Sequence, residues 1–115
     1  MNATVIDFGY LNRYLGGDRR MEREILVMFA EQTRTYLRDI ETADTARARI
    51  DAAHAVKGSA RGIGAHAVAD LACEVERLSK DGSAEDCRRA IEALGGAIEA
   101  AERAIALYLD RTVPA

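Results

Sequence analysis

The residues with the clearest capacity for chemistry lie in one short segment, where His54 is followed by Lys57 and Gly58. An exposed imidazole is largely neutral at cytoplasmic pH, so its lone pair can attack an electrophilic phosphorus. A lysine three residues further along a helix can bring its ammonium beside the imidazole and stabilise the charge that phosphorylation adds. Glycine weakens a helix, but one turn beyond the histidine it leaves bare backbone where a side chain would obstruct a partner.

This chemistry requires a helix that turns His54 toward solvent. Over residues 46–64, apolar residues recur with a helical period and predict a core-facing arc, made of Ile50, Ala53, Val56, Ala60 and Ile63. At about 100° per residue, His54 lies about 120° from the centre of that arc and therefore on the polar face. Arg47 and Arg61 share that face and are candidate partner-binding residues.

The charges around His54 oppose those of the chain as a whole. The chain carries a formal net charge of -3, whereas residues 46–64 contain a single acidic residue, Asp51, beside four basic ones: Arg47, Arg49, Lys57 and Arg61. A local positive field around the imidazole is therefore expected.

The rest of the chain predicts helices. The 115 residues include 1 proline and 5% aromatic residues, which leaves few strand-forming residues. The capping residues Asp7, Asp18 and Ser83, together with apolar periodicity, predict a short helix from Asp7 to about Leu15 and longer helices over about 19–40, 46–64, 65–80 and 84–110. We expect an all-α fold, an up-down-up-down antiparallel four-helix bundle over about 19–110 with the short N-terminal helix capping one end. Residues 1–115 are expected to form a single domain.

Each predicted long helix carries one apolar stripe. The stripe of the 19–40 helix is Leu26, Phe29, Thr33, Tyr36 or Leu37, and Ile40. In the 65–80 helix it is Val68, Leu71, Ala72, Val75 and Leu78, and in the last helix Cys87, Ile91, Leu94, Ile98, Ala101, Ile105 and Tyr108. Gly95-Gly96 interrupts the last helix, which predicts either a kink or a close helix crossing.

The residues from Ala53 to Ala60, followed by Gly64-Ala65, resemble the signature of the histidine phosphotransfer (HPt) family. The likeness covers most of the chain, because three further segments also resemble the family's pattern: Leu15-Gly16-Gly17-Asp18, Met28-Phe29 and Leu71 to Glu76. Two positions depart from the pattern: Val56 stands where the family more often has leucine, and Cys73 stands one place after the family's usual cysteine.

The resemblance implies that His54 is phosphorylated, that Lys57 stabilises the phosphoryl group and that Gly58 gives clearance for a receiver domain. It implies a phosphocarrier, without ATP-dependent kinase activity of its own, that relays a phosphoryl group between aspartates of receiver domains. The expected partners are response regulator receivers and a hybrid sensor histidine kinase. No cofactor is expected in the chain, because Mg²⁺ comes from the partner receiver.

The bulk properties and termini predict a cytoplasmic protein without nucleic-acid or membrane partners, and the chain is also expected to be a monomer. A mildly acidic protein does not attract anionic polymers or lipids. Residues 1–10 lack the basic flank of a signal peptide, and no apolar run is long enough to span a bilayer. Cys73 and Cys87 match no metal-ligand spacing and are expected to be reduced thiols.

Other interpretations compete with phosphotransfer. The order Lys57-Gly58-Ser59 is the wrong order for a nucleotide P-loop, and neither a P-loop nor an autonomous kinase is favoured. His66, Asp70 and Cys73 fall at i, i+4 and i+7 and could present zinc ligands, although a solvated helix face explains them better. The main alternative is a non-catalytic helical adaptor in which His54 is an ordinary surface residue of the partner-binding face.

Overall fold

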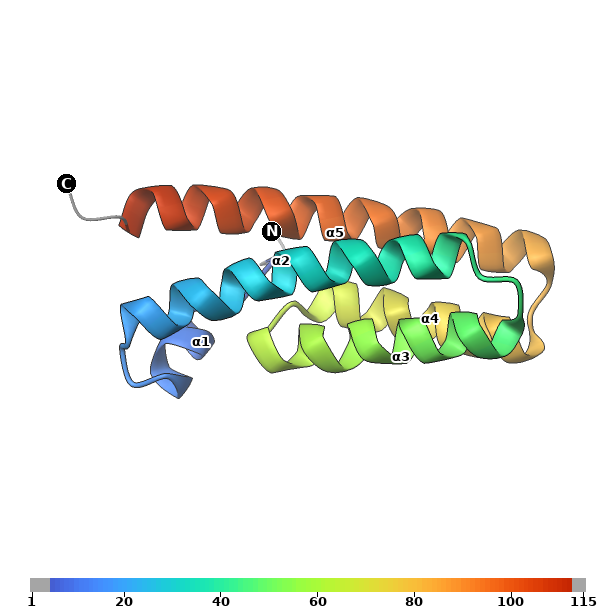
Figure 1. The fold of residues 1–115 in the computed structure, drawn as a ribbon, viewed down its shortest axis with the longest axis horizontal. Coiled ribbons are helices and arrows are strands. Elements are labelled where there is room, and N and C mark those ends of the chain that lie inside the picture. Colours follow the sequence, from blue (N-terminus) through green and yellow to red (C-terminus); the bar gives the residue numbers. More distant parts are fainter. Residues whose placement is uncertain (1–4, 113–115) are drawn as a thin grey trace.

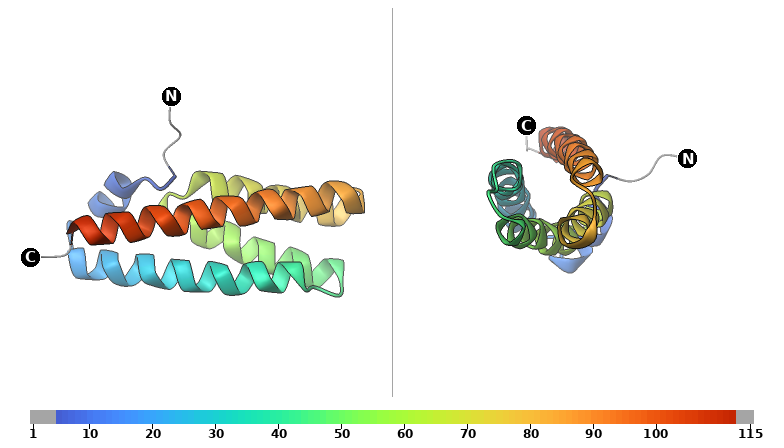
Figure 2. Two further views of the ribbon diagram at one scale, coloured as in Figure 1. Left: turned by 90° about the horizontal axis from the view of Figure 1, so that it is seen from above. Right: turned by 90° about the vertical axis from the view of Figure 1, so that its right-hand side faces the viewer.

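The computed structural model describes residues 5–112, and every secondary-structure element in that range is a helix (Figure 1). The helices are α1 (Phe8–Tyr14), α2 (Arg19–Glu41), α3 (Ala46–Ile63), α4 (His66–Asp81) and α5 (Ala84–Thr112). The all-helical prediction is confirmed. In Figure 1 the chain reverses direction at each connection from α2 to α5, and each of these four helices packs against two of the others. Seen end-on, they surround a common centre (Figure 2).

The helix ends follow the capping side chains in the sequence. The predicted N-terminal caps Asp7, Asp18 and Ser83 each accept a hydrogen bond from a backbone N–H, at 2.9, 3.0 and 3.0 Å. Gly64 ends α3 in the left-handed conformation with φ at 78°. A Cβ on Gly64 would lie 3.1 Å from the Cβ of Asp7, so glycine also lets the α3–α4 turn approach the start of α1.

The core is built largely from the predicted stripes, although Leu71, Leu78, Ile91 and Tyr108 are only half-buried, and Ala69 and Ala90, which lie outside the stripes, are buried. Ile50 was expected in the core and is only half-buried, whereas Ala52 is buried. The difference arises because α3 packs between two neighbours and not against one. Ala52 turns toward α2, where it borders the same shallow surface groove as Tyr36.

Gly95-Gly96 does not interrupt α5, which runs unbroken through both residues (Figure 1). A Cβ on Gly95 would lie 3.7 Å from Cδ2 of Leu37 on α2, an ordinary van der Waals contact. The position therefore does not depend on glycine for a close helix crossing. None of the helices within residues 5–112 combines the length and hydropathy needed to cross a bilayer.

The short helix α1 is held at one end of the bundle by buried contacts. Leu11 is buried, and the Phe8 ring stacks on the Tyr108 ring of α5 with centroids 4.1 Å apart. The Tyr108 hydroxyl donates to a carboxylate oxygen of Glu22 at 2.9 Å, and Glu22 is 1% exposed. Burial, followed by the Glu22 carboxylate, raises the pKa of Tyr108. These contacts connect α1, α2 and α5. The predicted α2 stripe did not include Glu22, whose buried carboxylate joins α2 to α5.

Candidate functional site

His54 lies near the middle of α3 with 70% of its side chain exposed. Its Nδ1 atom is 3.4 Å from Oε2 of Glu76 on α4. A carboxylate beside Nδ1 favours the tautomer with the proton on Nδ1, because only that tautomer can donate to it. The lone pair then resides on Nε2, which is the candidate nucleophilic atom.

Lys57 lies one turn after His54 and points toward α4. Its Nζ atom is 2.6 Å from Oε1 of Glu76, and both side chains are only 15% exposed. The two oxygens of Glu76 therefore contact Lys57 and His54 separately. The hydrogen bond from Lys57 is the largest cause that lowers the pKa of Glu76 below its ordinary value of 4.5, and burial works in the opposite direction. The carboxylate is consequently charged at neutral pH.

Arg47 and Arg61 lie on the same helix face as His54, because each is seven residues, or about two turns, from it. Both are exposed. Arg47 pairs with Asp51, with Nε and Oδ1 3.3 Å apart, while Arg61 borders a shallow groove with four residues of α4: Asp70, Cys73, Glu74 and Arg77. At about 1.5 Å per residue, each arginine is roughly 10 Å along the helix from His54. They share its surface without forming its immediate surroundings.

Gly58 is exposed, and apart from its chain neighbours and the backbone of its own helix, no heavy atom lies within 4 Å of the position that a Cβ would take. Its backbone conformation is helical, and its φ is not positive. Packing inside the protein therefore gives no reason for glycine at this position. The bare backbone beside His54 is open to an approaching molecule.

Glu76 is the site residue that sequence reasoning missed. The expected positive field around His54 counted only charges on α3, and the Glu76 carboxylate of α4 offsets part of it. One signal was present in the sequence: Lys57 has no acidic residue three or four positions away on its own helix. A lysine that is mostly buried requires an anionic partner, so another helix had to supply one.

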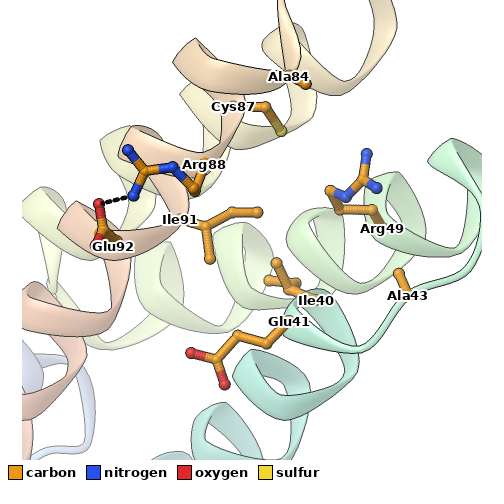
Figure 3. A pocket seen from close by; sticks show the side chains of 9 residues that line it. All are labelled: Ile40, Glu41, Ala43, Arg49, Ala84, Cys87, Arg88, Ile91 and Glu92. Atoms are coloured by element: carbon orange, nitrogen blue, oxygen red, sulfur yellow. Dashed lines mark hydrogen bonds and ion pairs between the residues drawn. The ribbon is translucent and has the colours of Figure 1, made fainter.

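His54 lies on an exposed surface, with 70% of its side chain accessible to solvent. A groove of about 530 Å³ lies elsewhere, between the α2–α3 connection and the start of α5, where Ile40, Cys87 and Ile91 supply apolar lining (Figure 3). His54 is not among its lining residues. Within residues 5–112, no three His, Cys, Asp or Glu side chains are grouped to hold a metal ion, so His66, Asp70 and Cys73 do not form the zinc site considered above.

The Lys57–Glu76 pair is expected to make stability depend on pH. The folded-state pKa of Glu76 lies below its ordinary value of 4.5, so its contribution is present above that value and is lost as the pH falls through the folded-state pKa. Urea denaturation at several pH values between 7 and 3 should show a smaller acid-induced loss of unfolding free energy for Glu76→Gln than for the wild type. An equal loss in both proteins would contradict this assignment.

A family model described as the Hpt domain matches residues 24–104, a range that includes all of α3 and α4. No curated protein and no solved structure was found to match the chain. The matched range is well over half of the chain and contains His54, Lys57, Gly58 and Glu76. The chain therefore belongs to the Hpt domain family.

Proposed function

We propose that this chain is a phosphocarrier that takes a phosphoryl group from an aspartate of one receiver domain onto Nε2 of His54 and passes it to another receiver. Hpt domains are histidine phosphotransfer modules of phosphorelays. The observation that carries the proposal is the orientation of His54, whose Nδ1 faces Glu76 while the side chain remains 70% exposed. A nucleophile this exposed suits a substrate that is itself a folded domain.

The transfer step follows from this orientation. The Nε2 lone pair attacks the phosphorus of the receiver's aspartyl phosphate, the N–P bond forms, and the P–O bond breaks to release the aspartate carboxylate. The imidazole retains its proton on Nδ1 and becomes cationic. The reverse step returns the phosphoryl group to the next aspartate. The receiver is expected to supply the Mg²⁺ that balances charge on the phosphoryl group.

The neighbouring residues have separate proposed roles. The Lys57 ammonium stabilises the phosphoryl oxygens by charge-assisted hydrogen bonds. Gly58 leaves room for the phosphorus of the receiver's aspartyl phosphate to approach within about 3 to 3.5 Å of Nε2. Arg47 and Arg61, two turns to either side on the exposed face, contact the receiver and favour an acidic partner surface through charge complementarity.

A phosphotransfer assay tests the proposal. Incubation with a ³²P-phosphorylated receiver and Mg²⁺ is expected to move label onto the chain, and the label should survive alkali and be lost in acid, as expected for a phosphoramidate. ATP and Mg²⁺ alone should leave the chain unlabelled, because a carrier receives its phosphoryl group from a partner. Rapid loss of label in alkali would indicate a carboxylate acceptor, and labelling from ATP would indicate a kinase.

A further inference from the structure

We propose that Glu76 competes with the phosphoryl group on His54 for the Lys57 ammonium and thereby favours return of the phosphoryl group to a receiver. This inference rests on the proposed function, because it concerns the phosphorylated form of His54. It assigns Glu76 a role as a positioning residue that sets how tightly the carrier holds its phosphoryl group.

Before transfer, the Lys57 ammonium is already paired with a carboxylate. Its partner is Oε1 of Glu76 at 2.6 Å, and both side chains are 15% exposed. Water screens this pair less than it screens the ion pairs on the outer faces of the bundle. Lys57 can contact a phosphoryl group on Nε2 only if it loosens this contact or shares its protons between two anions.

The contact of Glu76 with His54 has the opposite effect, because it favours the phosphorylated form of His54. The Oε2 atom of Glu76 is 3.4 Å from Nδ1, so the carboxylate supports the ring when phosphorylation makes it cationic. That contact is long for a hydrogen bond, and the His54 side chain is 70% exposed. The shorter and more sheltered Lys57 contact is therefore the stronger of the two, and the net effect of Glu76 is to disfavour phosphohistidine.

The consequence is a carrier whose resting state is stabilised at the expense of its loaded state. While His54 is unphosphorylated, the Lys57–Glu76 pair is intact. When the N–P bond forms, the phosphoryl group competes with Glu76 for the Lys57 ammonium and weakens the Lys57–Glu76 pair. Transfer of the phosphoryl group to an aspartate restores the pair. No additional reactant is needed, since the same N–P bond breaks as the aspartyl P–O bond forms.

The test measures the equilibrium share of phosphoryl group on His54 when the protein is mixed with a phosphorylated receiver and Mg²⁺. Glu76→Gln removes the competing charge but keeps the size of the side chain. It is expected to raise the ratio of phosphohistidine to phosphoaspartate about tenfold, the difference between a charge-assisted and a neutral hydrogen bond. Glu74→Gln is the matched control, because Glu74 is on the same helix and pairs with Arg77 at the surface. It should leave the ratio unchanged.

A double variant separates competition for Lys57 from simple repulsion. Lys57→Met keeps most of the apolar stem and removes the ammonium, and in that background Glu76→Gln should no longer raise the ratio. A rise that persists undiminished would show that repulsion alone is responsible, and it would overturn the proposal. A lower ratio in the single Glu76→Gln variant would overturn it as well, because the contact with Nδ1 would then dominate.

A spectroscopic readout does not depend on the receiver. The ¹⁵N signal of the Lys57 ammonium should shift when His54 is phosphorylated with phosphoramidate, and the shift should be larger in Glu76→Gln, where the lysine is free to move. An unchanged Lys57 signal would overturn the proposal. If the wild type acquires no label on His54 from either donor, the proposed function itself has failed. If the protein is labelled but Glu76→Gln leaves the ratio of phosphohistidine to phosphoaspartate unchanged, only the role proposed for Glu76 has failed.

Discussion

Replacing His54 with glutamine is expected to abolish labelling of the chain by a phosphorylated receiver. The amide of glutamine is polar and similar in reach, but its nitrogen has no basic lone pair with which to attack phosphorus. Because the His54 side chain is 70% exposed, the change should alter the free energy of unfolding by less than about 0.5 kcal/mol. The test is to measure acid-labile ³²P on the purified variant, which should be absent, together with the variant's urea denaturation curve.

The chain provides a matched control for this experiment. Its second histidine, His66, is also exposed and occupies the first position of α4. His66→Gln removes an equivalent ring without touching the contacts of Glu76, so it should be labelled like the wild type. Retained label on His54→Gln together with lost label on His66→Gln would move the phosphorylation site from α3 to α4.

Replacing Gly58 with glutamine is expected to reduce phosphotransfer on the order of 100-fold while the protein stays folded, since a small misplacement of reacting atoms has that effect. The Cβ position at Gly58 is free of neighbours, so the new side chain extends into the space that a receiver must enter. Loss of glycine from a helix interior should meanwhile stabilise the protein by up to about 1 kcal/mol. The transfer rate and the melting temperature should therefore move in opposite directions.

Gly96→Gln is the control for this second prediction. Gly96 is also exposed, helical and without neighbours at its Cβ position, but it lies on α5. The change should stabilise the helix similarly and leave transfer at the wild-type rate. If Gly58→Gln transfers phosphate as fast as the wild type, the receiver does not approach over this part of α3. The adaptor interpretation, in which the same face binds a partner without covalent chemistry, would then gain support.

The sequence alone was sufficient for features that depend on neighbours along the chain. A cap needs one side chain and the backbone three residues later, which is why the caps Asp7, Asp18 and Ser83 are where the sequence predicts them. The apolar period of α3 also placed His54 on an exposed face, since the direction of a side chain follows from helix geometry. The family likeness of the segment around His54 is confirmed by the Hpt match.

Only the tertiary structure decided which helices share the charges of the site. Lys57 and Glu76 are 19 residues apart, and their contact depends on the rotation and relative height of α3 and α4, which no local pattern encodes. The same reason explains Ala52, whose burial depends on α2 packing beside α3. The period of apolar residues within one helix indicates which of its side chains face the core. The pairing of side chains at the edges of the core depends on how two helices are placed relative to each other, so the sequence of either helix alone does not determine it.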